Sequence, residues 1–200
     1  ENSENITVKS NYSKAGNKEY YKNNKGEWTA IREEELEDLN SMNLTATDKN
    51  TYFSSKNSIS SIVNEYDDDK DSITIADEDS DEYKDAVESL SNDKKKAIVD
   101  TVINSGLDDN AKAYLYKKFY NSDTVDTIVN SGINVDDYLI YTTMEFTADK
   151  NSNGKTISGS RKNKVINYVN GLNLSIPQKA ILIKSTNTFK FNDYNYDIVS

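Results

Sequence analysis

The fold of this chain is decided by a short phrase, which reads Val102-Ile103-Asn104-Ser105-Gly106-Leu107-Asp108 and returns at residues 128–134 and 168–173. Each copy follows the apolar end of a predicted helix with a Gly, an apolar residue and a polar residue. Gly ends helices because it adopts the left-handed conformation easily, and Asp, Asn or Ser caps the next helix. The phrase therefore predicts helices in tandem, and it indicates an architecture without indicating a chemistry.

A comparison of the chain with itself gives a second sign of repetition. Placing Ile98 on Val165 without a gap pairs apolar residues with apolar residues as far as Leu115 and Leu182. A small shift then places residues 128–129 on 198–199. Helical repeats bury their apolar faces by stacking on their neighbours. We therefore expect a unit of about three helices to be repeated, with the second copy incomplete; the alternative is chance similarity between two amphipathic hairpins.

The N-terminal third has a different pattern. We expect residues 1–16 to be polar and mobile, and residues 19–31 to form a β-hairpin, because two aromatic runs flank an Asn- and Gly-rich turn. Apolar residues at helical spacing predict helices over residues 32–43 and 58–66. The run from Asp67 to Glu82 is so acidic that it predicts a linker or a long exposed loop.

We therefore expect a mainly α-helical chain of helical hairpin repeats, preceded by a small N-terminal module that contains a β-hairpin. The expected parts are an N-terminal module (1–66), an acidic linker (67–91), a first helical repeat (92–148), a polar loop (149–159) and an incomplete second repeat (160–200). The expected helices of the repeats are 93–105, 108–120, 122–130, 135–147, 160–171 and 175–184. The first and last residues suggest a fragment cut from a longer polypeptide.

The composition restricts the classes of function. The chain has 200 residues, a net charge of −10, and no Cys or His. The charge argues against direct binding of nucleic acid or of an anionic membrane, and the missing residue types exclude thiol catalysis and Ser-His-Asp machinery. No apolar run reaches the roughly 18 residues of a membrane span, and we expect no signal peptide. Residue usage fits a low-GC bacterial genome.

One segment has a partial metal-binding pattern. Asp149, Asn151 and Asn153 precede Gly154 with the alternate spacing of a calcium loop. The twelfth position of such a loop requires a bidentate Glu, but it is occupied by Ser160. A polar turn that ends in a Ser160 helix cap is therefore the favoured interpretation, and we expect no cofactor.

Aromatic residues provide the candidate interaction sites. Tyr is enriched at protein interfaces, and we expect Tyr114, Tyr138 and Tyr168 to be exposed near helix ends and to contact partners. Trp28, beside Tyr20 and Tyr21, is a further candidate for interaction or for stacking on a sugar, although such clusters more often form the small core of a hairpin.

A family resemblance is found at Asp149-Lys150-Asn151-Ser152-Asn153-Gly154-Lys155-Thr156-Ile157-Ser158-Gly159-Ser160-Arg161-Lys162, and it continues through residues 165–170 and 177–182. This stretch resembles the repeat-bearing part of very large virion-associated proteins of phages and prophages of low-GC Gram-positive bacteria, of the tail tape-measure and DNA-ejection type. The resemblance covers roughly residues 93–200. It matches no catalytic residue, and it implies that any enzymatic domains lie elsewhere in the parent protein.

We therefore expect a non-enzymatic structural fragment of a phage tail or DNA-ejection protein that contacts other virion proteins. Its expected location is the virion, or the bacterial cytoplasm before assembly. The first alternative is an acidic inhibitor that mimics nucleic acid and blocks a host nuclease, as anti-defence proteins do, because the acidic residues are clustered. The second alternative is a peptidoglycan-cleaving enzyme domain. The sequence leaves the oligomeric state open.

Overall fold

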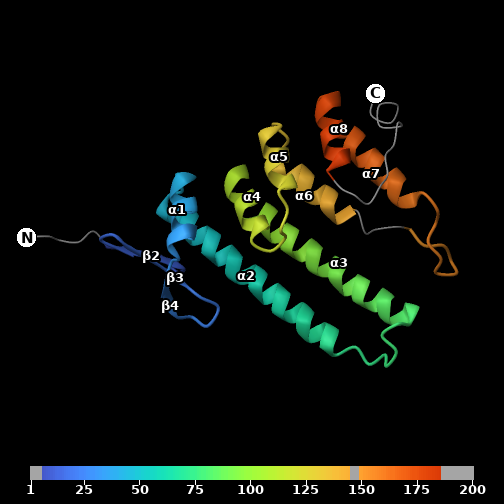
Figure 1. Ribbon diagram of the computed structural model, residues 1–200, viewed down its shortest axis with the longest axis horizontal. Coiled ribbons are helices and arrows are strands. Elements are labelled where there is room, and N and C mark those ends of the chain that lie inside the picture. The colour runs from blue at the N-terminus through green and yellow to red at the C-terminus, as the bar shows by residue number, and fades with distance from the viewer. Residues whose placement is uncertain (1–5, 145–148, 186–200) are drawn as a thin grey trace, which may run out of the picture. The chain divides into compact units, whose positions relative to one another are not determined.

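The computed structural model describes residues 6–144 and 149–185, which form two compact units, the first ending at Leu115 and the second beginning at Tyr116 (Figure 1). The described residues contain eight helices and four strands, so the expectation of a mainly helical chain with a small β-containing N-terminal module is confirmed. None of the helices in these described ranges has the length and the apolar character that a membrane span requires.

Unit 1 begins with a four-stranded antiparallel sheet in the order of the sequence. Its strands are β1 (Ile6–Val8), β2 (Tyr12–Ala15), β3 (Lys18–Lys22) and β4 (Trp28–Ala30). The predicted hairpin is confirmed as β3 and β4, with Tyr20 opposite Ala30. The expectation that residues 1–16 are mobile is wrong for the described part, residues 6–16, because β1 and β2 extend the hairpin and Tyr12 is 1% exposed.

The inner face of this sheet packs on the long helix α2 (Ala46–Asp71). The ring of Tyr21 stacks on Phe53, with the ring centroids 4.8 Å apart. The Nδ2 of Asn57 donates to the carbonyl oxygen of Lys22 at 2.8 Å. Because side chains alternate along a strand, burial of this face turns the neighbouring residues of each strand away from the helix.

One short helix follows the sheet and precedes a helical hairpin. The short helix α1 (Glu33–Ser41) buries Leu39. A capping box of Thr45 and Asp48 starts α2, and Ser80 caps α3 (Asp81–Ile103). The helices α2 and α3 lie side by side over most of their length, and residues 72–80 join them at the far end from the sheet (Figure 1).

The acidic linker expected at residues 67–91 is therefore wrong in its bounds, because only residues 72–80 lie between the helices. Residues 67–71 complete α2, and residues 81–91 belong to α3. The acidic residues of this run are exposed, whereas Tyr66 and Leu90 are half-buried. Acidic side chains on the solvent side of a helix do not prevent it from forming, and packing of one helix on the other supplies the stability that the local sequence lacks.

Unit 2 consists of short helices packed in sequence order. The helix α4 (Asp109–Lys117) spans the boundary between the units, and α5 (Thr124–Asn130), α6 (Val135–Met144), α7 (Ser160–Asn170) and α8 (Ile176–Lys184) follow. The helix α6 contacts both α5 and α7, and α7 contacts α8. The phenol of Tyr141 donates to the carbonyl oxygen of Ile183 at 3.0 Å. The fully buried side chains of this unit include Val125, Ile128, Leu139, Tyr141, Val165, Val169, Leu182 and Ile183.

The repeated phrase ends α3, α5 and α7, as the sequence predicts. Gly106 and Gly132 adopt the left-handed conformation, with φ of 80° and 74°. The amide of Ile133 donates to the carbonyl oxygen of Ile128 at 3.2 Å, which is the long bond of a Schellman motif. Gly171 differs, since its φ is −76° and it continues the right-handed helical conformation.

The two segments aligned by the self-comparison have matching local settings. Ile98 and Val165 are both buried in helices, and Val102 and Val169 are both fully buried near the ends of those helices. This is the outcome that the repeat predicts. The proposed match of residues 128–129 to residues 198–199 lies outside the described residues.

Candidate interaction surfaces

The outer face of the N-terminal sheet carries the most exposed large apolar side chains of unit 1. Ile6 is 68% exposed, Val8 is 67% exposed and Trp28 is 43% exposed. Strand register places Val8 opposite Ser13, and Ser13 opposite Tyr20, so these residues share one face. We call the set Ile6, Val8, Ser13, Tyr20 and Trp28 the outer sheet face. Side chains of Val8, Ser13, Tyr20 and Trp28 line a shallow hollow of about 240 Å³.

The charge around the outer sheet face is opposite to that of the whole chain. Residues 6–30 carry five Lys and two Glu, although the net charge of the protein is −10. Lys18 and Lys22 share the outer face of β3 with Tyr20, whereas Glu19 is buried on the inner face. The Nζ of Lys22 lies 5.2 Å from the centroid of the Trp28 ring. The outer sheet face therefore combines apolar side chains with positive charge.

The predicted aromatic cluster around Trp28 is divided between the two faces of the sheet. Tyr21 belongs to the core of unit 1, because it stacks on Phe53. Tyr20 and Trp28 point to the opposite side of the sheet, since they share a face with Ala30 and Lys22 respectively. The aromatic cluster thus supplies both a hairpin core and an exposed surface. Side chains alternate between the two faces along a strand, so Tyr21 lies in the core and Tyr20 on the exposed surface.

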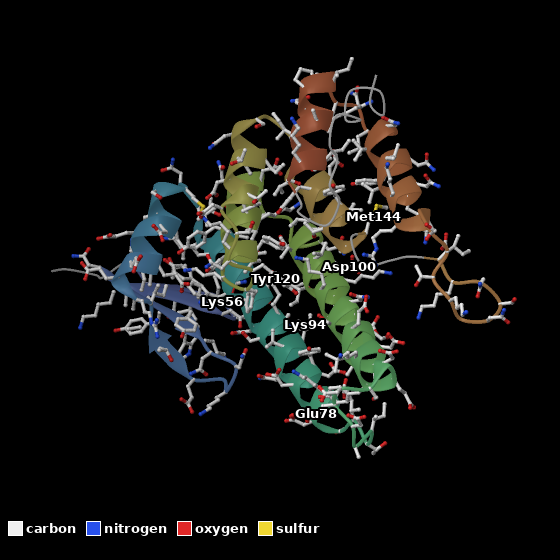
Figure 2. The ribbon with its side chains drawn as sticks, turned by 45° about the vertical axis from the view of Figure 1, so that its right-hand side comes forward. Lys56, Glu78, Lys94, Asp100, Tyr120 and Met144 are labelled. Atoms are coloured by element: carbon white, nitrogen blue, oxygen red, sulfur yellow. The ribbon has the colours of Figure 1, made fainter. Side chains whose placement is uncertain are left out.

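The far end of the α2–α3 hairpin carries the opposite charge. Residues 67–82 contain nine acidic residues and one Lys. All nine acidic residues are exposed, and Glu78 projects at the end of the hairpin (Figure 2). Ile73 and Ile75 lie in the connection between the helices and are half-buried. We call residues 67–82 the hairpin end.

A small cavity lies along the hairpin, between α2 and α3. It has a volume of about 250 Å³ and is lined by Ile62, Glu65, Tyr66, Asp69, Leu90, Asp93, Lys94 and Ala97. The Nζ of Lys94 lies 4.2 Å from the centroid of the Tyr66 ring, and Figure 2 shows Lys94 between the two helices. This cation–π contact ties α3 to α2. The cavity is therefore a feature of helix packing.

The three tyrosines predicted as exposed contact residues are not exposed. Tyr138 is 4% exposed, and its ring meets the ring of Tyr116 edge to face. Tyr114 is half-buried and donates to the Oδ2 of Asp38 at 2.8 Å. Tyr168 is half-buried and donates to the carbonyl oxygen of Asp137 at 2.9 Å. Burial raises the phenol pKa of Tyr114 and of Tyr168, and nearby carboxylates raise it further.

A buried ionic network connects the sheet to α2. The Nζ of Lys49 lies 2.7 Å from the Oε1 of Glu19, and both side chains are less than a tenth exposed. The phenol of Tyr12 donates to the same oxygen. Burial raises the pKa of Glu19, but the hydrogen bonds from Lys49 and Tyr12 outweigh burial and lower it. Burial, followed by the bond to Glu19, raises the pKa of Tyr12.

A second network connects α1 to α2. The carboxylate of Glu35 accepts from the phenol of Tyr52 at 3.0 Å and from the Nζ of Lys56 at 2.9 Å. Lys56 lies on the side of α2 that faces the sheet and α1 (Figure 2). Burial is the main reason why the phenol pKa of Tyr52 is raised, with the charge of Glu35 next. Lysine and tyrosine side chains therefore hold both buried carboxylates of unit 1.

Two of the three candidate calcium ligands, Asp149 and Asn151, have side-chain partners within the protein. The Oδ1 of Asp149 lies 2.6 Å from the Nζ of Lys164. The Oδ1 of Asn151 accepts from the amides of Asn153 and Lys155, both at 3.0 Å. Within residues 6–144 and 149–185, no group of three His, Cys, Asp or Glu side chains is arranged to hold a metal ion.

The loop at residues 149–159 is closed by Ser160, although not in the expected way. Gly159 is the residue that precedes α7, and it makes no side-chain cap. The Oγ of Ser160 instead accepts from the amide of Asp149 at 2.9 Å. The expected helix cap is therefore wrong, because the side chain ties the start of the loop to the start of α7.

Comparison with protein-family models, with curated proteins and with solved structures gives no match to this chain. The surfaces of the chain are therefore the guide to its function. Of the outer sheet face, the sequence pattern predicted Trp28 as a candidate interaction residue, but it did not predict Ile6, Val8 and the lysines around them. The available signal was the alternation Ile6-Thr7-Val8, which is typical of a strand with one apolar face.

Proposed function

We propose that this chain is a non-enzymatic interaction module of a larger protein assembly, and that it docks through the outer sheet face. The observation that carries the proposal is the exposure of Ile6, Val8 and Trp28 on one side of a sheet whose other side is packed on α2. Contiguous exposed apolar side chains with a polar rim are typical of protein–protein interaction sites. The surface is small, so we expect a weak contact that gains strength from repetition in an assembly.

The buried ionisable groups support a structural interpretation of the rest of unit 1. Glu19 and Glu35 are the buried carboxylates of this unit, and each is held by one lysine and at least one tyrosine. Such networks fix the sheet and α1 on α2. This leaves the outer sheet face as a rigid platform, which lowers the entropic cost of docking.

The type of assembly is proposed from the resemblance at residues 149–182. We infer that the parent protein is a virion-associated protein of the phage tail or DNA-ejection type, with other virion proteins as partners. The tandem helices of the chain support this inference, because stacked repeats build long proteins from short units. The type of parent protein and the docking surface are independent proposals, so an experiment can exclude one and leave the other.

Photo-crosslinking tests the docking surface. A photoreactive phenylalanine analogue is placed at Trp28 in the full chain, and the control carries it at Glu88, which is exposed on α3. We expect irradiation within the assembly to give one discrete adduct from position 28 and none from position 88. No adduct from position 28, or the same adducts from both positions, would overturn the proposal.

A second candidate function is supported by the hairpin end. Its nine acidic residues lie at the end of α2, in the connection and at the start of α3. The two packed helices hold them in place, so they are not spread along a flexible linker. A rigid array of carboxylates imitates phosphates better than a mobile one, which favours a nucleic-acid-mimicking inhibitor of a host nuclease. Nuclease inhibition that weakens with salt would support this candidate. Inhibition unchanged after Asp77, Asp79 and Asp81 are changed to Asn would exclude it.

A further inference from the structure

We propose that the occupant of the outer sheet face is the hairpin end of a second copy of this chain, so that copies associate head to tail. This inference rests on the proposed function, since it names the partner of the same docking surface.

Charge complementarity is the first argument. The outer sheet face is bordered by Lys18 and Lys22, and by Lys9 and Lys25 in the adjoining connections. The hairpin end carries nine acidic residues against one Lys, all exposed. Opposite potentials on two surfaces steer association and fix the orientation of the partners.

Apolar complementarity is the second argument. The hollow formed by Val8, Tyr20 and Trp28 is open and mostly apolar. The connection at the hairpin end presents Ile73 and Ile75, which are only half-buried in the protein itself. An isoleucine side chain is small enough for this hollow. Docking would remove apolar surface from water on both sides, at about 25 cal/mol per Å².

The length of α2 makes the contact intermolecular. The sheet contacts the N-terminal part of α2, at residues such as Lys49, Phe53 and Asn57, whereas the hairpin end begins at Asp67. The helix has 26 residues and is therefore about 39 Å long. Figure 1 shows the sheet and the connection at opposite ends of the hairpin. A hairpin end cannot reach its own sheet, so it must meet another copy.

The chemistry of the outer sheet face favours a protein over a polyanion. Ile6 and Val8 are its most exposed members, and their aliphatic side chains, unlike the less exposed ring of Trp28, offer no stacking platform for bases. The hairpin end of the same unit would also repel phosphates. A protein segment with carboxylates and aliphatic side chains fits both properties of the face.

The contact is heterologous, because two different patches of the chain meet. Heterologous contacts produce open chains, or rings when the rotation closes. The patch is smaller than the interfaces of stable complexes, and its charges are exposed. We therefore expect dissociation constants on the order of 10–100 µM at low salt, and weakening by several-fold when salt is raised.

Charge-reversal variants test the inference by sedimentation velocity. The sheet variant carries Lys18→Glu and Lys22→Glu, and the hairpin variant carries Asp79→Lys and Asp81→Lys. The sheet variant makes residues 6–30 acidic, and the hairpin variant removes about half of the net negative charge of the hairpin end. We therefore expect each variant alone to lose the self-association of the wild type by at least about tenfold. Mixing them leaves one pair of unchanged surfaces, the outer sheet face of the hairpin variant and the hairpin end of the sheet variant. We therefore expect the mixture to form one-to-one dimers.

The control variant, Lys150→Glu with Lys155→Glu, changes the same charge at exposed positions of the loop at residues 149–159. It should associate like the wild type, and circular dichroism checks that every variant is folded. A wild type that stays monomeric to about 500 µM at low salt would overturn the inference, as would a mixture that fails to associate.

The same experiment separates this inference from the proposed function. A monomeric chain whose position 28 still crosslinks to another protein would leave the docking surface valid and remove the second copy as its occupant. Binding of a single-stranded oligonucleotide or of anionic vesicles by a monomeric chain, with a change in Trp28 fluorescence, would overturn both the second copy and the protein nature of the partner.

Discussion

The ion pair of Glu19 and Lys49 is the clearest residue-scale contribution to stability in unit 1. Lys49→Met removes the cation and leaves the Glu19 carboxylate in a site that is less than a tenth exposed. We expect this change to lower the free energy of unfolding by about 3–5 kcal/mol. Urea denaturation followed by circular dichroism measures the loss.

The matched control is Lys164→Met, because the pair of Lys164 and Asp149 is 39% and 53% exposed. Exposed pairs contribute about 0–1 kcal/mol. The double variant Glu19→Gln with Lys49→Met leaves no buried charge and should recover part of the stability. Equal losses for Lys49→Met and Lys164→Met would contradict this account of the network.

Buried phenols give the protein a specific sensitivity to alkali. The pKa values of Tyr12, Tyr52, Tyr114 and Tyr168 are raised, mainly by burial. A raised folded pKa contributes stability that is complete below the unfolded value of about 10 and is lost as pH rises above it. We expect helical content to fall as pH rises past about 10.

The variant Tyr114→Phe tests this dependence. It keeps the ring beside Tyr52 and removes the phenol that donates to Asp38. Stability of the variant, measured by urea denaturation between pH 9 and 11, should fall less steeply with pH than that of the wild type. The difference can approach about 1.4 kcal/mol per pH unit for one group. Parallel curves would show that the Tyr114 phenol stays protonated in both states or contributes nothing.

The tyrosines also show what sequence alone could not supply at the residue scale. All three lie in helices, as predicted, but their predicted exposure was wrong, because Tyr is compatible with both core and surface. Tyr138 is buried against Tyr116, and Tyr114 reaches Asp38, which is 76 positions away. Local periodicity carries no information about such distant partners.

At the scale of elements, the helix ends formed by the repeated phrase predict opposite changes in stability when two of their glycines are replaced by alanine. Gly106 has a φ of 80°, and open space surrounds the position of an added Cβ, so the cost of Gly106→Ala is that of the backbone alone. We expect this substitution to lower stability by about 1–2 kcal/mol. Thermal melting measures the effect.

Gly171→Ala is the comparison, because Gly171 has a φ of −76°. An added Cβ would meet the carbonyl oxygen of Asn167 at 3.4 Å, which is an ordinary contact. Alanine reduces the entropy of the unfolded chain, so we expect this change to be neutral or to stabilise by up to about 1 kcal/mol. If both substitutions destabilise equally, the two helix ends do not differ as the structure shows.

Helices with strong apolar periodicity were predictable from the sequence, and α5, α6, α7 and α8 begin or end close to the expected residues. The acidic ends of α2 and α3 were not, because their apolar stripe is sparse and their stability comes from each other. Strands β1 and β2 were also missed. They are short, and their pairing with the predicted hairpin is a tertiary property.

At the scale of the whole molecule, the class of fold followed from composition and periodicity, whereas the candidate site did not. The outer sheet face gathers Ile6, Val8 and Trp28 from strands at the two edges of the sheet. The strand register that brings them together depends on β2 and β3 between them. The basic charge of residues 6–30 was present in the sequence but was hidden by the net charge of −10.

We expect the outer sheet face to be covered by the hairpin end of a second copy when copies of the chain associate. Trp28 is the single tryptophan of the protein and lies on this face, so its fluorescence reports on the claim directly. As the protein concentration rises at low salt, we predict that the emission of Trp28 shifts to shorter wavelength and becomes less accessible to acrylamide, and that added salt reverses both changes. Emission and quenching that stay constant across the concentration range at both salt levels would contradict the account.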